Sequence, residues 1–170
     1  MKKLILAGIM AVGILFTTTA QNKIGYISTE DLIADMPEAE KADADLKRFQ
    51  SELSQTGQEM MRDLQVKDSL FVRDSAKLSP SMKEIKREEL IELYQKVQNW
   101  NQKAQEMYQN RAQELIAPLR VKAMDAIKAV AKDNGYGYVL DSQAIIVAPP
   151  GDDLLPLVRK KLGIKDPAKP

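Results

Sequence analysis

The chain contains no cysteine and no histidine, and these two absences restrict the chemistry that it can perform. Without cysteine there is no disulfide and no thiolate nucleophile, and without histidine the commonest general base and metal ligand is missing. Two carboxylate pairs remain. Glu88 and Glu89 stand among basic residues, as on a solvated helix face, and Asp152 and Asp153 precede Leu154, where helix capping is the simpler interpretation. We therefore expect a protein that is not an enzyme, with no catalytic residue, metal or cofactor.

Glycine and proline are almost absent from the middle of the chain. Residues 38–78 contain one glycine, Gly57, and no proline, and residues 81–117 contain neither. Helices of roughly 40 residues would each be about 60 Å long, longer than a small domain is wide. We therefore predict that residues 37–118 form two long helices that leave a small body and return to it, with a reversal at residues 79–81.

No apolar run is long enough to span a membrane. Lys2 and Lys3 are followed by an apolar run at residues 4–16 and by small residues at 17–20, which is typical of a cleavable signal peptide. A membrane anchor would need about 20 apolar residues. We expect a soluble, exported chain that begins at Gln21 and, since no cysteine stands there, carries no lipid.

Neither sign of charge is in excess. Removal of Lys2 and Lys3 with the signal peptide leaves 23 of the 25 basic residues against 24 acidic ones, so the formal net charge changes from +1 to −1. A near-neutral chain has no general attraction for nucleic acid, and we predict no nucleic-acid partner.

Large apolar residues recur along each predicted helix mostly at steps of three, four or seven, which places them on one stripe. The first stripe consists of Leu46, Phe49, Leu53, Met60, Leu64, Phe71 and Leu78. The second consists of Met82, Ile85, Leu93, Val97, Trp100, Ala104, Met107, Leu115 and Ile116, most of which should meet the first in an antiparallel pair. Polar Thr56, Lys67 and Asp74 occupy the missing turns of the first stripe, so the seam is thinner than that of a filled coiled coil.

Strand-forming residues bracket the helical region. Residues 23–27 (KIGYI) predict a buried strand, and Ser28, with an acidic residue three positions on, predicts the start of a short helix. Pro118 should interrupt and kink the second long helix where it re-enters the body, and the helical pattern should resume and end at Asn134–Gly135.

The C-terminal region contains two further apolar segments, residues 136–140 and 144–148. They flank Asp141–Gln143 and predict a tight hairpin, followed by a final helix from about residue 153 to 162. Three strands that are apolar at nearly every position leave open edges and a bare face, which copies of the same chain would cover. The predicted fold class is therefore α+β, mostly α.

The predicted organisation has four parts. These are a signal peptide (1–20), a discontinuous oligomerisation body (21–36 and 119–163), a helical hairpin arm (37–118) and a flexible tail (164–170).

Several segments occur in a characteristic order. They are the signal peptide, residues 23–27, the short helix around Leu32–Ile33, the long hairpin, residues 129–141 (AVAKDNGYGYVLD) and residues 151–158 (GDDLLPLV). This order resembles the Skp/OmpH family of periplasmic chaperones. The resemblance covers essentially the whole mature chain, and its two ends are its most specific parts, because a helical hairpin by itself matches many families.

The resemblance implies a homotrimer in which strands of three subunits close a small barrel and three helical hairpins surround a cavity. Unfolded outer-membrane proteins would be held in that cavity in the periplasm, without ATP, until the outer-membrane assembly machinery receives them. The positions that match the barrel are Ile24, Tyr26, Ile27, Tyr138, Leu140, Ile145 and Val147.

A chaperone of this kind needs many weak apolar contacts on a mobile support, since it must release its client without an energy source. Methionine suits the task because its side chain adapts to irregular partners. The candidates for client contact are Met60, Met61, Leu70, Phe71, Met82, Ile85 and Met107, each of which could instead pack within the hairpin.

Two further points bear on the partners. The best-known family members are strongly basic and meet acidic lipid and lipopolysaccharide, whereas this mature chain is slightly acidic, so we do not carry direct membrane or lipopolysaccharide binding over to it. The alternative function is a secreted coiled-coil structural or adaptor protein that docks a folded envelope partner. Such a spacer should have filled heptads, and the polar gaps in the first stripe favour the chaperone.

Overall fold

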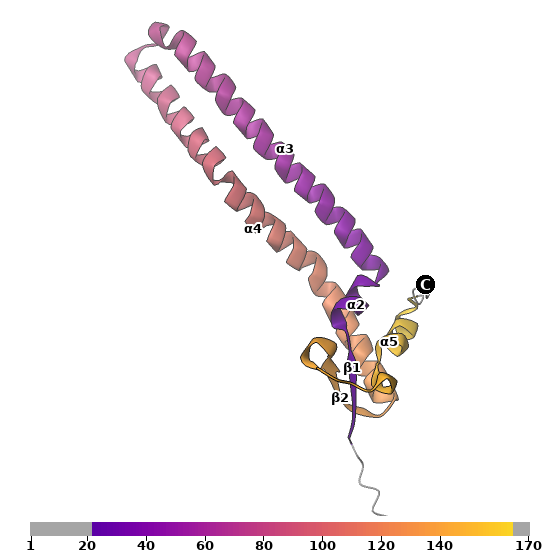
Figure 1. Cartoon of the computed structure of the whole chain (residues 1–170). Helices are drawn as coiled ribbons and strands as arrows, with labels where there is room; N and C mark the ends of the chain where they lie inside the picture. The colour runs from indigo at the N-terminus through magenta and orange to yellow at the C-terminus, as the bar shows by residue number, and fades with distance from the viewer. Residues whose placement is uncertain (1–21, 165–170) are drawn as a thin grey trace, which may run out of the picture.

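The computed structural model describes residues 22–164 as a long helical hairpin on a small body (Figure 1). The predicted signal peptide and residues 165–170 of the predicted tail lie outside the described residues. The elements are β1 (Lys23–Ile27), α2 (Thr29–Ala34), α3 (Pro37–Asp74), the 3-10 turn η1 (Ser75–Lys77), α4 (Pro80–Asp133), β2 (Tyr136–Asp141), η2 (Ser142–Ala144), η3 (Pro150–Asp152) and α5 (Leu155–Leu162). The fold is α+β and mostly helical, as the sequence predicts.

Both arms of the hairpin begin where the sequence predicts. Pro37 is the first residue of α3, where the missing N–H costs nothing because the first N–H groups of a helix have no partner within it. Ser79 caps α4, and its hydroxyl accepts a hydrogen bond from the Met82 N–H at 3.3 Å. Figure 1 shows α3 and α4 running antiparallel along each other, as expected for two facing apolar stripes.

The predicted interruption at Pro118 is wrong, because α4 continues through this residue to Asp133, whereas the kink predicted there stays a prediction. Proline in a helix interior removes one backbone hydrogen bond, to the carbonyl four residues earlier. Leu119 and Ala123, in the turns that follow, are buried against the body, so tertiary packing holds the helix in place across the proline. The predicted end of α4 is confirmed: Gly135 has a φ of 72°, the left-handed conformation that glycine adopts at low cost.

The two strands that bracket the helical region lie next to each other. β1 pairs with β2 in parallel, with Ile24 opposite Tyr138 and Ile27 opposite Asp141. On the other side of β1, the Leu154 N–H donates to the Tyr26 carbonyl at 2.9 Å. The whole hairpin is therefore the crossover between two parallel strands, which require a long connection.

The predicted β-hairpin after residue 136 is wrong. The Asp141 carboxylate accepts a hydrogen bond from the Gln143 N–H at 3.0 Å, and this turn leads into η2 instead of a second strand. Residues 145–148 form no strand in the single chain, and Ile146 is fully exposed. The physical reason is that the side chain of Asp141 satisfies the turn locally, and the chain then enters η2 without returning along the free edge of β2.

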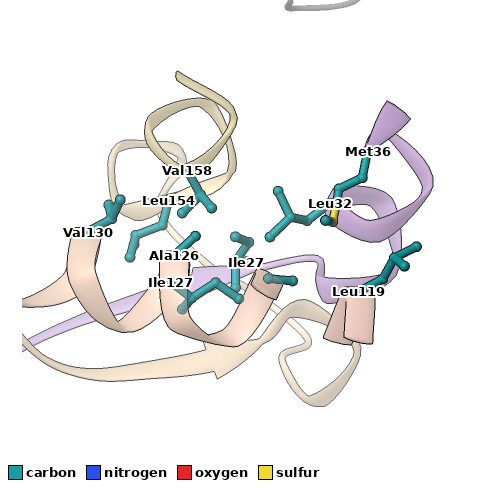
Figure 2. Packing of buried hydrophobic residues seen from close by; sticks show 10 residues of the cluster. Ile27, Leu32, Met36, Leu119, Ala126, Ile127, Val130, Leu154 and Val158 are labelled. Carbon is teal, nitrogen blue, oxygen red and sulfur yellow. The ribbon is translucent and has the colours of Figure 1, made fainter. Parts of the chain in front are cut away.

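The hydrophobic core lies in the body, between β1, α2, the end of α4 and α5 (Figure 2). Its buried residues are Ile27, Leu32, Met36, Leu119, Ala123, Ala126, Ile127, Val130, Leu154 and Val158. At about 25 cal/mol per Å² of buried apolar surface, such side chains contribute most of the stabilisation of a small domain. The same helix, α4, thus serves as one arm of the hairpin and as the centre of the body.

A partly buried ion pair joins α5 to the end of α2. The Arg159 guanidinium donates from Nε at 2.8 Å and from Nη2 at 2.5 Å to the Asp35 carboxylate. The Asp153 carboxylate accepts from the Leu155 N–H at 2.9 Å, one residue before the N-cap position, which Leu154 occupies without a side-chain cap bond. These contacts hold α5 against the core.

Candidate functional site

The arms differ along their length in how much apolar surface they bury. We call residues 37–57 and 100–117 the body half and residues 58–99 the tip half. Ala42 and Leu53 in the body half are buried, whereas no residue of the tip half is. The exposed large apolar side chains of the tip half are Met61, Val66, Leu70, Val72, Met82, Ile85, Ile91 and Tyr94. In the body half, Met107 alone has this property among the described residues.

The structure places the seven client candidates at different depths. Five of them expose their side chains, four in the tip half, namely Met61, Leu70, Met82 and Ile85, and one, Met107, in the body half. Met60 and Phe71 are partly buried along the seam between the arms. Their assignment to client contact stays a prediction.

A groove follows the seam in the tip half. Its volume is 890 Å³, and its walls come from both arms. The lining residues are Met61, Leu64, Gln65, Asp68, Phe71, Arg87, Leu90, Ile91, Tyr94, Gln95 and Gln98. A second groove of 370 Å³ lies nearer the tip and shares Phe71 and Leu90 with the first. The tip half therefore offers mostly apolar, open concavities with charged residues at their edges.

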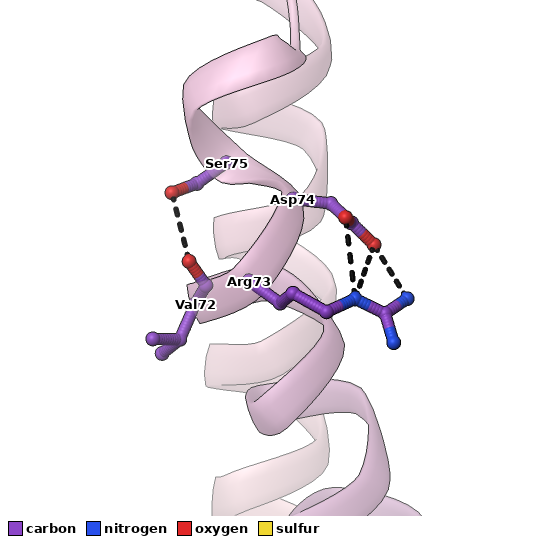
Figure 3. Close-up of polar contacts among 4 residues, drawn as sticks. All are labelled: Val72, Arg73, Asp74 and Ser75. Atoms are coloured by element: carbon purple, nitrogen blue, oxygen red, sulfur yellow. Dashed lines mark hydrogen bonds and ion pairs between the residues drawn. The ribbon is translucent and has the colours of Figure 1, made fainter.

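The three polar residues that interrupt the first stripe make hydrogen bonds and ion pairs within their own helix. The Thr56 hydroxyl donates to the Glu52 carbonyl at 2.9 Å, and the Lys67 ammonium lies 2.9 Å from the Asp63 carboxylate. Asp74 pairs with Arg73 (Figure 3). None of the three pairs with the opposite arm, so these turns of the seam gain no polar contact in place of the missing apolar one.

The reversal at the tip is closed by local contacts (Figure 3). The Arg73 guanidinium donates to both oxygens of the neighbouring Asp74 carboxylate, and this interaction lowers the pKa of that carboxyl. The Ser75 hydroxyl donates to the Val72 carbonyl at 3.5 Å. All of these contacts lie within α3 and its end, and they shape the turn without covering the apolar residues near it.

The hairpin has a close contact at mid-length, on the boundary between the two halves. The Trp100 indole N–H of α4 donates to the Leu53 carbonyl of α3 at 3.2 Å. Gly57 lies beneath the ring, and a Cβ built at this position would stand 2.7 Å from the indole Cδ1 and Nε1 atoms. The backbone of α3 can thus approach the indole only because residue 57 is glycine.

The body carries a second apolar surface. Ile24, Tyr138, Leu140 and Val147 are exposed there, and Tyr26 and Ile145 are partly buried. Ile27 is only 2% exposed, because it packs in the core of its own chain, so its side chain is covered without a second copy. Six of the seven positions predicted for oligomerisation therefore remain available to a partner in the single chain.

A groove of 620 Å³ runs across this second surface. It is lined by β1, by β2 and by the segment after β2, including Ile24, Leu140, Ile145 and Val147. β2 has no buried residue, and its apolar side chains away from the core have no cover within the chain. This bare sheet face is the feature that the sequence predicts for strands that copies of the chain would complete.

Residues 22–164 contain no helix that is both long and apolar enough to cross a membrane. In the same part of the chain, histidine, cysteine, aspartate and glutamate side chains form no group of three or more that is arranged to hold a metal ion.

Sequence reasoning missed the contact between Gly57 and Trp100. Two signals pointed to it: Gly57 is the one glycine of the arms, and Trp100 is the one tryptophan of the chain. Their pairing could not be read from the sequence, because the register between two helices with an underfilled seam is set by which side chains fit together. The tip-half groove was also missed, since it depends on the same register.

The fold and these surfaces define an arm-and-body protein, in which one antiparallel helical hairpin projects from a small α+β base. A family model for outer membrane proteins of the OmpH-like type matches residues 23–162. The chain belongs to this OmpH-like family, as the resemblance in its sequence indicates.

Relatives of known name support the assignment. The chaperone protein Skp of Photorhabdus luminescens is 29% identical over 171 residues, and that of Photorhabdus laumondii subsp. laumondii is 25% identical over 167 residues. Each alignment covers 95% of this chain and 99% of the relative. The names of these relatives support a chaperone role for the chain.

A solved structure from Caulobacter crescentus CB15, described as an OmpH-like outer membrane chaperone, has a similar fold. It has a TM-score of 0.68 and covers 88% of this chain and 90% of its own chain at 16% identity. At this identity the likeness shows the shared fold alone.

Proposed function

We propose that this chain is an ATP-independent holdase chaperone of the periplasm that binds unfolded outer-membrane proteins between its helical arms and prevents their aggregation. In this proposal residues 1–20 direct export and are removed, residues 37–118 form the arm, and residues 21–36 and 119–163 form the body that assembles three copies. The tail begins at residue 164.

One observation carries the proposal: exposed apolar side chains are concentrated in the tip half of the hairpin, and three of them, Met61, Ile91 and Tyr94, line an open groove of 890 Å³. Water-exposed apolar surface of this extent lowers solubility, and it is typical of a surface that meets another molecule. The methionines among these residues adapt to partners of different shape, and the polar gaps in the seam leave the arms free to adjust. Both properties suit a client without a fixed structure.

The uncovered sheet face supports assembly. β1 and β2 form a sheet of two strands, and such a sheet is marginal unless more strands or further packing complete it. The exposed segment after η2 is apolar and lies beside this sheet. In a homotrimer, segments from three subunits would pair at these edges and close the barrel, and three hairpins would surround a shared cavity.

An aggregation assay tests the holdase function. An outer-membrane β-barrel protein in urea is diluted into buffer with and without the mature chain, in the absence of nucleotide, and light scattering is followed. We expect the mature chain to suppress scattering, whereas an unrelated folded protein at the same mass concentration leaves it unchanged. Scattering that rises equally in both cases would refute the proposed function.

The assembly is tested separately by multi-angle light scattering at micromolar concentration. We expect the mass of a trimer, and we expect Tyr138→Glu to lower it, because a carboxylate at this exposed sheet position would be buried in the barrel. A mature chain with the mass of a monomer would contradict the trimer and leave the aggregation assay to decide the holdase function.

A further inference from the structure

The contact between Trp100 and Leu53 differs from every other hydrogen bond in the arms. Within residues 22–164, only two side-chain hydrogen bonds join α3 to α4: Lys122 to Glu38 at the body end and Trp100 to Leu53 at mid-length. Nearer the tip, the described side chains bond within their own arm. Trp100 is thus the outermost polar link between the two helices.

The geometry of the contact is specific. In an α-helix the carbonyl of residue 53 already accepts the N–H of residue 57, so the indole adds a second donor to a carbonyl that is in use. A carbonyl oxygen has two lone pairs and can accept both. The indole reaches this oxygen across Gly57, where any other side chain would collide with the ring at 2.7 Å. Donor, acceptor and glycine therefore form one unit.

Burial changes at the same place. Leu53, whose carbonyl is the acceptor, is 7% exposed and is the last buried residue of α3 on the way to the tip. The tip-half groove begins beyond it at Met61 and Leu64. Complete burial and polar linkage between the arms thus end together, at one level of the hairpin.

We propose that Trp100, Gly57 and the Leu53 carbonyl form a mid-arm clamp, which keeps the body half of the hairpin closed while the tip half separates independently. Segments with few buried contacts open at low free energy, and segments with buried contacts open only with the whole structure. The clamp sets the boundary between these two behaviours. On the basis of the proposed holdase function, it lets the groove widen for clients without loosening the body that holds the copies together.

Hydrogen exchange on the mature chain, without any client, tests the clamp. We expect amides of the tip half to exchange faster than those of the body half, with the change near residues 57 and 100. In Trp100→Phe, which keeps a ring but removes the donor, and in Gly57→Ala, exchange at residues 100–110 should rise about fivefold, the factor that one ordinary hydrogen bond represents. The exchange rate is measured on α4 because alanine at position 57 has a higher helix propensity than glycine and would by itself slow exchange in α3.

Two controls make the result specific. Ser51→Ala, at an exposed position of the same helix, should leave exchange at residues 100–110 unchanged. Adding Gly57→Ala to Trp100→Ala should have no further effect there, because residues that act as one unit are not additive. The single tryptophan also reports directly, and its emission should shift to longer wavelength in Gly57→Ala as the ring becomes more exposed.

The clamp is refuted if amides at residues 100–110 exchange in the Gly57→Ala and Trp100→Phe variants as they do in the unaltered chain. It is also refuted if the effects of Gly57→Ala and Trp100→Ala on exchange at these residues are additive. Because no client is present, these outcomes are independent of the aggregation assay. A chain that fails that assay can still show the clamp.

Discussion

The two halves of the hairpin are built from the same kind of helix and differ in what they do with their apolar residues. The body half buries Ala42 and Leu53, and its arms are linked by the Trp100–Leu53 hydrogen bond at one end and by the bond from Lys122, just beyond the half, to Glu38 at the other. The tip half buries no residue completely and exposes eight large apolar side chains, three of which line an open groove. The difference teaches that one continuous pair of helices can place its buried, stabilising contacts near the body and its exposed apolar surface near the tip.

This division has a physical consequence for a chaperone. A hairpin that buried all of its apolar residues between its own helices would be stable but would leave no apolar surface to bind an unfolded chain. A surface left open along its whole length would unfold easily or aggregate. Anchoring the arms at the base leaves the tip half free to stay exposed.

Removal of part of the tip half should have the largest effect. Deletion of residues 66–91, with a short Gly-Ser turn joining Gln65 to Glu92, should leave the trimer intact and abolish most suppression of client aggregation. The reason is that the body core and its exposed sheet face lie outside the deletion. Light scattering measures both properties. A deletion variant that protects clients as well as the full chain would show that the tip half is not the part that binds them.

Equivalent leucines in the two halves should differ in their contribution to stability. Leu53→Ala removes a buried side chain, and we expect the free energy of unfolding to fall by about 2 kcal/mol, the low end for buried leucine because the arm can relax around the cavity. Leu64→Ala, at a partly exposed position of the tip half, should cost about half as much. Urea titration of each variant measures the difference, and equal losses would show that the halves are packed alike.

Exposed apolar residues of the tip half should affect binding and not folding. Replacing Met61, Leu70 and Ile85 together by glutamine should change the free energy of unfolding by less than about 0.5 kcal/mol per site, as is usual for surface positions. Client protection should nevertheless fall several-fold, because apolar contacts are lost.

The matched control for this triple variant is Met107→Gln, a client candidate that lies in the body half. The comparison predicts that it retains most of its protection. If it loses as much as the triple variant, client contact extends over the whole arm and is not concentrated near the tip.

The smallest expected effect is the loss of stability at low pH, where the ion pair between Glu38 and Lys122 is lost. The Lys122 ammonium donates to the Glu38 carboxylate and lowers the pKa of that carboxyl, so its contribution to stability is present above the unfolded pKa near 4.5 and is lost as the pH falls through the lower folded value. Glu38→Gln should therefore be slightly less stable than the unaltered chain at pH 7, and this difference should shrink as the pH falls from 4.5 towards 3.

Asp74 provides the contrast at the tip. The pKa of its carboxyl is also lowered, but by Arg73 of the same helix, so Asp74→Asn should not change how tightly the two arms associate at any pH. Thermal melting at both pH values measures the two variants. A difference between Glu38→Gln and the unaltered chain that is as large at pH 3 as at pH 7 would show that the ion pair is not its cause.

Much of the fold could be predicted from local signals. Pro37 and Ser79 mark the starts of the two long helices and Gly135 the end of the second, because each of these residue types has a conformation or a missing donor that suits a helix boundary. The hairpin predicted after residue 136 failed for the opposite reason. Two apolar segments around a polar turn are compatible with a hairpin, but this pattern does not specify the turn, and here the Asp141 side chain closes a turn that leads into η2.

The candidate site could be predicted only in outline. Met61, Leu70 and Tyr94 do not belong to either predicted stripe, and they are exposed. The grooves and the contact at Trp100 could not be predicted, because they require residues of two arms to be matched in register. Sequence spacing describes one helix at a time.

The sequence by itself determined the helical arms, their starts and turns, the thinness of their seam and the family to which the chain belongs. These properties depend on local conformational preference and on the order of residues. The tertiary structure alone decided that β1 pairs with β2, that α4 runs through Pro118, and that Trp100 meets the α3 backbone over Gly57. These depend on contacts between residues far apart in the chain, whose energies outweigh the local preferences that the sequence displays.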